Sequence, residues 1–198
     1  MKDIELLTER TKLRLIQLFD LDFIHQLHSL PETDEYNALG IPKNSEETKA
    51  IILPWIEENQ RTEIVNYTFI IEQQNDNKSI GLFGIKVGNK KYKRAEVWYK
   101  IHSAFWNKGF ATEVLDNVLT FCFDELKLHR VQAGCAVGNI GSIKVLEKVG
   151  MTREGRGRQI LPLKSGWSDN FEYAILESDR RKNKILKPLS KLQNFEQR

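Results

Sequence analysis

The stretch FWNKGFATEV, residues 105–114, places a glycine at the start of a helix-forming pattern. Gly109 therefore stands where the first backbone N–H groups of a helix have no partner. Those groups and the helix dipole favour a bound phosphate, and a residue without a side chain lets the backbone approach it closely. Lys108 adds a positive charge, and the small Ala111 keeps the first turn uncrowded. The alternative is a plain turn between a strand and a helix.

A carboxylate in the preceding strand pattern could move protons. Alternation along this strand puts Glu96, Trp98 and Lys100 on one face. If that face borders a cleft, apolar neighbours would favour the protonated carboxyl and suit Glu96 to act as a general base, directly or through water. The alternative is a surface charge paired across strands.

Further polar candidates lie closer to the C-terminus. Asn139 and Ser142 are three residues apart and share a face of a predicted helix. From the residues alone, Asn139 indicates a helix N-cap and Ser142 a tolerated small residue. Tyr173 is a weaker candidate for an acid, because strand alternation favours a place in the core. Asp169 lies near the mouth of an expected groove, or is a turn residue that follows Gly166.

Neither metal nor cysteine chemistry is indicated. His25 and His28 are three apart on a predicted helix, but no third ligand accompanies them, so packing roles are expected. Cys122 and Cys135 lie in apolar stretches, which indicates buried thiols and not a disulfide or a nucleophile.

The composition indicates one soluble domain. The chain has 198 residues, 40% of them hydrophobic and 29% charged, which suits one packed core. No apolar run approaches the roughly 20 residues of a membrane helix, and the first ten residues lack a signal-peptide core. We therefore expect a cytoplasmic protein that makes no membrane contact.

Charge is uneven along the chain. Residues 180–198 hold seven Lys or Arg and one Glu, whereas the net charge of the whole chain is +3, so residues 1–179 are mildly acidic. We expect a domain at 1–179 and a basic C-terminal extension at 180–198. The extension is interpreted first as solvated chain, and alternatively as an electrostatic contact for RNA such as a ribosome surface.

Apolar periodicity predicts the elements that must position these residues. Strand patterns cover residues 12–18, 67–73, 79–88, 94–102, 129–137, 151–161 and 167–178. Helical patterns cover residues 21–30, preceded by the cap Asp20, then 44–61, opening with Ser45, then 109–125 and 139–150. Short turns join the strands between 67 and 102 into an antiparallel meander, whereas a helix joins 94–102 to 129–137, so these two can run parallel. The order predicts an α/β or α+β fold, with a mixed and mostly antiparallel sheet flanked by helices.

The loop, the helix behind it and the Asn139–Ser142 helix together resemble the GCN5-related N-acetyltransferase (GNAT) superfamily. The family's phosphate motif is Arg or Gln, two variable residues, Gly, one variable residue, then Gly or Ala. Residues 106–111 read WNKGFA, so the first position departs from the motif. That aromatic residue, AEVWYKI at 95–101 and WSDNFEYAIL at 167–176 resemble the RimJ/RimL-like ribosomal-protein alanine N-acetyltransferase branch.

The resemblance implies an enzyme that uses acetyl-CoA, releases coenzyme A and needs no metal. It implies a sheet splayed between the fourth and fifth strands, where the pantetheine arm pairs with the exposed strand edge at Tyr99, Lys100 and Ile101. It also implies that Ser142 assists the departing sulfur and that Asn139 contacts pantetheine or ordered water. The implied pyrophosphate contacts are Trp106, Asn107, Lys108, Gly109, Phe110, Ala111 and Thr112.

The acceptor implied by the resemblance is a primary amine, and the branch implies the α-amine of a protein N-terminus, acetylated directly in a ternary complex. An α-amine has a pKa near 7.7–8.0, against about 10.4 for Lys, so it needs only modest help from a base. Some relatives carry a base on the strand after Gly155, but RGRQILPL at 156–163 has no carboxylate, which leaves Glu96 or a base-free site. We expect Trp98 and Asp169 to contact the acceptor.

Two other functions stay open. A small-molecule amine, such as a polyamine, an amino acid or an aminoglycoside, could be the acceptor, or the chain could be a non-catalytic module that binds acyl-CoA or RNA. Residues 20–61 and 160–170 would build the acceptor groove, where an open groove favours a peptide and a closed acidic pocket a cationic amine. A monomer and a homodimer are both compatible with the sequence.

Overall fold

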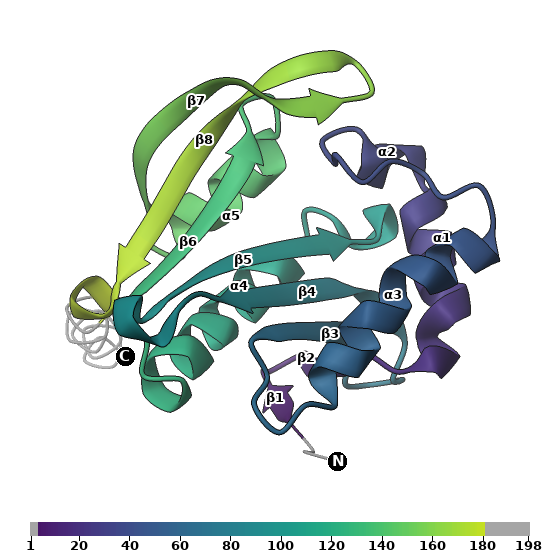
Figure 1. Ribbon diagram of the computed structural model, residues 1–198, viewed down its shortest axis with the longest axis horizontal. Helices are drawn as coiled ribbons and strands as arrows, with labels where there is room; N and C mark the ends of the chain where they lie inside the picture. The colour runs from purple at the N-terminus through teal and green to yellow at the C-terminus, as the bar shows by residue number, and fades with distance from the viewer. Residues whose placement is uncertain (1–3, 181–198) are drawn as a thin grey trace, which may run out of the picture.

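The computed structural model describes residues 4–180, in which one eight-stranded sheet has helices on both faces (Figure 1). The strands lie in the order β1-β2-β3-β4-β5-β6-β8-β7. Their bounds are β1 Glu5–Leu7, β2 Thr11–Leu15, β3 Asn66–Gln73, β4 Ser79–Val87, β5 Arg94–Ile101, β6 Arg130–Ala136, β7 Thr152–Leu163 and β8 Gly166–Leu176. The α-helices are α1 Leu21–Ser29, α2 Pro31–Asp34, α3 Ser45–Asn59, α4 Phe110–Thr120 and α5 Ile140–Lys148. The shorter turns are η1 Leu18–Asp20, η2 Lys90–Tyr92, η3 Ser103–Phe105 and the π-helical η4 Phe121–Glu125.

Side-chain alternation along the central strands builds a core on each face of the sheet. Phe69 and Ile71 of β3 are fully buried in the cluster that includes Val114 and Val118 of α4. Ile70, which lies between them, belongs instead to a second cluster with α1 and α3. The strand period of two therefore fixes α4 and α5 on one face and α1 and α3 on the other (Figure 1).

The predicted splay of the sheet is confirmed. The meander β3–β4–β5 is antiparallel, and β5 runs parallel to β6. The register of β5 and β6 extends only from Arg94 opposite Arg130 to Glu96 opposite Gln132. Beyond Glu96 the two strands separate, as Figure 1 shows, so residues 97–101 of β5 have no strand partner on that side.

Local details differ from the sequence prediction. Strand β1 was not predicted, because three residues are too few for a clear period. Helix α3 is capped by Asn44, whose Oδ1 accepts a hydrogen bond from Glu47 N at 2.9 Å, and not by Ser45. Asp20 does not cap α1 through its side chain, because its carboxylate accepts from Gln17 N at 2.8 Å and from Arg14.

The last described residues pack against the domain. Residues 177–180 are helical, and Arg180 is 8% exposed. Its guanidinium pairs with the Asp116 carboxylate and donates to Thr120 Oγ1 at 3.2 Å, so it holds α4. Arg180 thus packs with the domain, and the rest of the proposed extension, 181–198, lies outside the described residues. Within residues 4–180, none of the helices combines the length and apolar character that a membrane crossing requires.

Candidate functional site

The turn before α4 has the geometry expected of an anion site. Gly109 is the N-cap of α4 and has a left-handed backbone with φ of +83°. Residues with a Cβ rarely adopt this conformation, so the turn itself requires glycine. In the described part of the chain no side chain caps this helix, so its first N–H groups keep their hydrogen-bonding capacity. Their use by a phosphate group stays a prediction.

The residues before Gly109 fix the loop against the end of β5. Trp106 Nε1 donates to Ile101 O at 2.7 Å, and Lys108 Nζ donates to Ala104 O at 2.8 Å. Asn107 has a positive φ of 59°, a conformation that Asn tolerates better than most residues. Trp106, which departs from the family motif, therefore has a structural role, because its indole anchors the loop to the strand.

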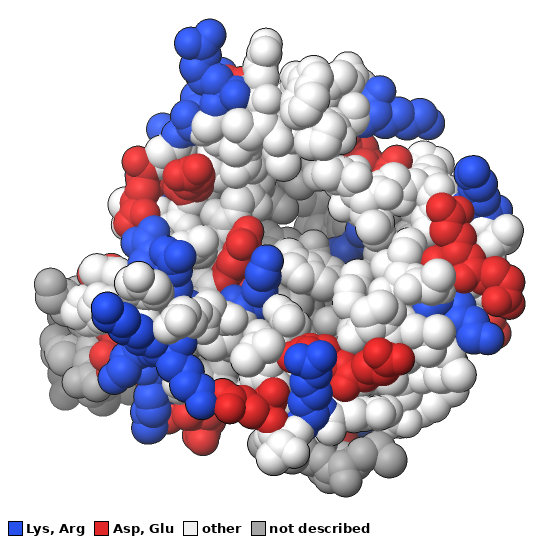
Figure 2. All heavy atoms as spheres, viewed as in Figure 1, with Lys and Arg blue, Asp and Glu red and all other residues white. Residues whose placement is uncertain are grey.

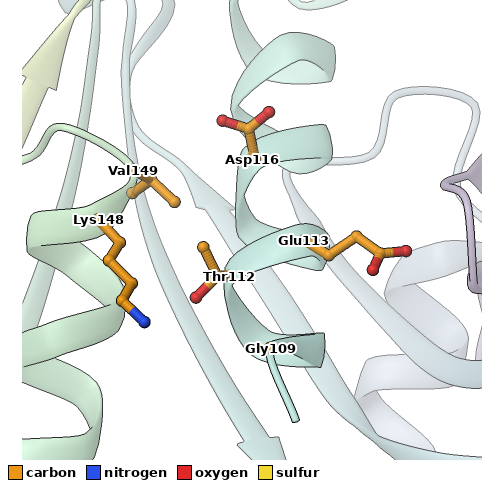
Figure 3. A pocket seen from close by; sticks show the side chains of 6 residues that line it. All are labelled: Gly109, Thr112, Glu113, Asp116, Lys148 and Val149. Atoms are coloured by element: carbon orange, nitrogen blue, oxygen red, sulfur yellow. The ribbon is translucent and has the colours of Figure 1, made fainter.

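A groove of about 370 Å³ extends from this turn between α4 and α5 (Figure 3). Its lining residues are Gly109, Thr112, Glu113, Asp116, Lys148 and Val149. Figure 3 shows the Lys148 side chain extending from α5 toward the first turn of α4. Lys148 was not a sequence candidate, because nothing local to α5 indicates that it faces α4.

Arg10 is a second cation that the sequence did not indicate. Its Nη1 donates to Lys108 O at 2.9 Å, its guanidinium contacts the Glu113 carboxylate at 2.6 Å, and it lies 4.5 Å above the Phe110 ring. Burial favours neutral Glu113, but hydrogen bonds from Thr8 and Arg10 outweigh it and lower the pKa of this carboxyl. The segment before β2 thereby holds the first turn of α4 in place.

The backbone edge in the splay belongs mainly to Tyr99. His102 N donates to Ile80 O on β4 at 2.9 Å, so by alternation the backbone groups of Lys100 also face β4, whereas those of Tyr99 and Ile101 face away from it. The carbonyl of Ile101 is already taken by the Trp106 indole. Lys100 was also expected at this edge, but its backbone groups face β4. Only its side chain can therefore contribute to the site.

Two hydroxyls meet at the splay. Asn139 caps α5 as its residue type indicates, with Oδ1 accepting from Ser142 N at 3.0 Å. Burial raises the pKa of Tyr99 to about 12, and the nearby Ser142 hydroxyl partly opposes the shift. The Tyr99 hydroxyl is buried, and no group in residues 4–180 meets hydrogen-bond geometry with it. Tyr99 and Ser142 thus bring an unsatisfied hydroxyl and a second hydroxyl to the same place.

Glu96, Trp98 and Lys100 share the face of β5 that looks toward α1 and α3. The ring centroids of Trp98 and Trp55 of α3 are 5.7 Å apart, and Lys100 Nζ lies 3.0 Å from His28 Nδ1 of α1. Glu96 is exposed and occupies the last paired position before β5 and β6 separate. The enclosed apolar setting considered for its carboxylate is therefore absent, although its place at the vertex of the splay suits access by water.

Two candidates near the C-terminus have structural partners. Asp169 accepts from Arg156 Nε at 2.7 Å and from Gln159 N at 2.8 Å, so both its oxygens stabilise the irregular part of the β7–β8 hairpin. The predicted contact of Asp169 with the acceptor stays a prediction. Tyr173 is 1% exposed and donates to Glu147 Oε1 at 3.2 Å, which agrees with the core position preferred for it.

The histidines of α1 have separate partners. His25 Nδ1 lies 2.8 Å from Thr48 Oγ1, while His28 contacts Lys100. Across residues 4–180, no group of three or more His, Cys, Asp or Glu side chains is arranged to hold a metal ion.

Comparison with known proteins identifies the family to which this fold belongs. The model of the acetyltransferase (GNAT) domain matches residues 10–152. This match covers most of the chain, and the protein therefore belongs to the GNAT acetyltransferases and is an N-acetyltransferase. The resemblance seen in the loop and in the Asn139–Ser142 helix is confirmed at the level of the family.

Individual relatives agree with the family. The probable N-acetyltransferase YjcK of Bacillus subtilis is 31% identical over 165 residues, which cover 83% of this chain and 86% of YjcK. Spermidine N-acetyltransferase from Vibrio cholerae, in complex with CoA and spermine, superposes with a TM-score of 0.76 at 24% identity, covering 86% of this chain and 98% of that one. RimL, a ribosomal-protein α-N-acetyltransferase in complex with coenzyme A, gives 0.78 at 20% identity, with coverages of 87% and 98%. Both structures share the fold, and their named acceptors differ.

Proposed function

We propose that this protein transfers the acetyl group of acetyl-CoA directly to the α-amine of a protein N-terminus. The observation that carries this choice is the charge on the acceptor side of the splay. Lys100 places a buried ammonium group there, only 9% exposed. A polyamine keeps at least one further ammonium group when its reacting amine is neutral, and that group would meet like charge at this point. A peptide whose α-amine is neutral brings no such charge from its N-terminus.

Acetyl-CoA, which supplies the acetyl group as a thioester, fits the α4 and α5 side of the sheet. The uncapped first turn of α4 suits the pyrophosphate, and Lys148 in the adjoining groove suits a further phosphate. The outward backbone groups of Tyr99 suit the amides of the pantetheine arm. RimL and the spermidine enzyme, which share the fold, bind coenzyme A.

Proton movements are assigned to residues at the splay. Glu96 would receive the proton of the attacking amine through water, because its carboxylate is exposed at the vertex. The Ser142 hydroxyl would donate a hydrogen bond to the sulfur as the carbon–sulfur bond breaks, and the Tyr99 hydroxyl beside it would support that donor. No metal takes part in this scheme.

The acceptor would approach from the face that carries α1–α3. Figure 2 shows this face hollowed between the β7–β8 hairpin and the α1–α2 segment. Trp98 is 38% exposed, so its indole offers an apolar surface to the first residue of a peptide. A hollow of about 390 Å³ lies between the α2 region and the hairpin and would hold further residues of an extended chain.

A polyamine is the second candidate, because α2 carries the acidic residues Glu32 and Asp34, with Glu35 directly after it. The similarity to the spermidine enzyme supports the same candidate. Glu32 and Glu35 are exposed on the α2 segment, and the negative charge of Asp34 already acts on the Lys100 ammonium group at the splay, where the reacting amine must be placed.

An acetyl-CoA consumption assay over peptides and small amines tests the proposal. Peptides with a free N-terminal amine should be acetylated with a higher kcat/KM than spermidine, amino acids or aminoglycosides. Mass spectrometry of the product should place the acetyl group on the α-amine. A preference for spermidine over every peptide would instead establish the second candidate.

Several finer expectations also remain proposals. One is that the basic extension contacts a ribosome. Beyond Arg180 this extension is residues 181–198, which lie outside the described part of the chain. We also propose a cytoplasmic location, and a monomer or a homodimer as the assembly. Ribosome cosedimentation of the full chain at low and high salt, with a chain ending at Arg180 as control, would test the first of these.

A further inference from the structure

A buried polar cluster joins three elements on the acceptor side of the splay. Its members are His28 of α1, Asp34 of α2 and Lys100 of β5, which are 1%, 4% and 9% exposed. Lys100 Nζ lies 3.0 Å from His28 Nδ1, and the negative charge of Asp34 acts on Lys100. Buried polar groups are normally fully paired, so the bonding capacity left over in this cluster is informative.

The contacts of the cluster show which groups have spare capacity. Burial, the Lys100 charge and His25 together lower the pKa of His28 to about 4, so its imidazole is neutral near pH 7. A Lys ammonium can only donate, so His28 Nδ1 accepts and the ring proton lies on Nε2. His28 Nε2 is buried and has no partner among residues 4–180. Lys100 has further N–H groups to donate as well.

The acidic member has spare capacity of the opposite kind. Asp34 Oδ1 is buried and lacks a hydrogen-bond partner within residues 4–180. Asp34 also lines the hollow between the α2 region and the β7–β8 hairpin, opposite Leu163 and Lys164. The cluster therefore combines spare donors on His28 and Lys100 with a spare acceptor at the end of the hollow.

We propose that this cluster recognises the first peptide unit that follows the acceptor amine, with Lys100 donating to its carbonyl oxygen and Asp34 accepting from an N–H group. A peptide unit has both an acceptor and a donor, so it can satisfy both kinds of spare group. A polyamine has no carbonyl oxygen for Lys100, and a free amino acid has no following N–H group for Asp34. This inference rests on the proposed function and specifies which residues select the acceptor.

The test compares two acceptors that differ only in the recognised group. Wild-type protein and Lys100→Met are assayed with an alanine tripeptide amide and with propylamine, which has a reactive amine but no carbonyl. Lys100→Met should lower kcat/KM for the tripeptide on the order of 10- to 100-fold, mainly through KM, because a hydrogen bond to a charged group is lost. It should leave propylamine nearly unchanged, and Lys100→Arg should restore part of the loss.

Two further variants test the inference without a substitution at Lys100, which could itself destabilise the protein. Asp34→Ala removes the acceptor without breaking a hydrogen bond in the described structure, and should lower tripeptide kcat/KM selectively as well. Lys91 is an exposed lysine in the turn between β4 and β5, and Lys91→Met is the matched control. This variant should leave kcat/KM unchanged for both acceptors.

The outcomes separate this inference from the proposed function. If wild-type protein acetylates amines but no peptide, the proposed function fails and the inference falls with it. If wild-type protein acetylates the tripeptide, the proposed function stands. If Lys100→Met and Asp34→Ala then lower kcat/KM equally for both acceptors, or for neither, only the inference is overturned. Selective loss of the tripeptide in both variants supports it.

Discussion

The indole of Trp98 lies directly over Gly84, its cross-strand neighbour on β4. A Cβ placed on Gly84 would come within 2.1 Å of both Cε2 and Nε1 of that ring. The glycine therefore makes room for Trp98 to lie flat on the sheet and to contact Trp55 of α3. The position of the Trp98 indole in the proposed acceptor groove therefore depends on the absence of a side chain at Gly84.

Gly84→Ala should displace Trp98 and weaken acceptor binding. Overpacking should lower the free energy of unfolding by about 1–3 kcal/mol. The KM for the acceptor should rise, while affinity for acetyl-CoA stays unchanged, because the α4 turn lies on the other face. Denaturant unfolding and steady-state kinetics measure both effects. Gly141→Ala, where the nearest contact of a new Cβ is 3.6 Å, should not destabilise, and equal effects of the two variants would contradict the role given to Gly84.

Gly109→Val should weaken acetyl-CoA binding at least tenfold. At φ of +83° a β-branched residue is strained by roughly 1–2 kcal/mol, so the turn that exposes the first N–H groups of α4 should deform. The surroundings are not the cause, because a Cβ there would meet only Arg10 Nη2, at 3.4 Å. Calorimetric titration with acetyl-CoA gives the dissociation constant.

Gly40→Val is the matched control for the α4 turn. Gly40 has a similar φ of +79° and nothing within 4 Å of a new Cβ, but it lies in the loop after α2. It should be destabilised by the same backbone strain and still bind acetyl-CoA normally. If Gly109→Val also binds acetyl-CoA normally, Gly109 only turns the chain.

Ser142→Ala should lower kcat about 100-fold or less, with little change in acetyl-CoA affinity. A hydrogen bond to the departing sulfur strengthens as negative charge develops, so its loss acts on turnover and not on ground-state binding. Steady-state kinetics with any accepted amine, together with calorimetry, separates the two. Full turnover by this variant would leave water or the unsatisfied Tyr99 hydroxyl as the donor, and Tyr99→Phe would decide between them.

A chain ending at Arg180 should fold and bind acetyl-CoA like the full-length protein, whereas a chain ending at 179 should be less stable. Arg180 binds the Asp116 carboxylate, and its Nη2 donates to Asp116 O at 2.9 Å, so its removal should cost about 1–3 kcal/mol. Arg180→Ala in the full-length protein should reproduce this loss. Thermal unfolding measures all three variants, and equal stability of the two truncated chains would show that Arg180 contributes nothing.

Stability should fall between about pH 6.5 and pH 4 because of His28. The pKa of His28 is lowered from 6.5 to about 4 by burial and by the Lys100 and His25 charges. In this range the unfolded chain binds a proton that the folded protein does not, so folding loses up to about 3 kcal/mol as the pH falls. His28→Asn, which keeps an acceptor for Lys100, should remove this contribution.

Urea unfolding at pH 7 and pH 4.5 measures the effect as a difference between wild type and His28→Asn, because carboxylates also titrate in both proteins. His129→Asn, at an exposed histidine, should keep the wild-type pH dependence. A His28→Asn profile parallel to that of the wild type would contradict the burial of a neutral imidazole.

Local sequence patterns were enough to locate the α4 turn and most of the sheet. Gly109 stands at a helix start, Asn139 has the residue type of an N-cap, and the spacing of Glu96, Trp98 and Lys100 places them on one face. Each of these signals depends on residues within a few positions of one another, so the period of a helix or strand and the preferences of caps reveal them. The splay was implied by family resemblance, since no local pattern shows where two strands separate.

The partners of these residues were decided by tertiary structure. Lys100 meets His28 across 72 positions, and Arg10 meets Glu113 across 103. Asp169 proved to be occupied by Arg156 of the facing strand, a contact that follows from the hairpin register and its bulge. A local pattern fixes the face on which a side chain lies, but burial, unmet hydrogen bonds and shifted pKa values depend on what the rest of the chain packs against that face.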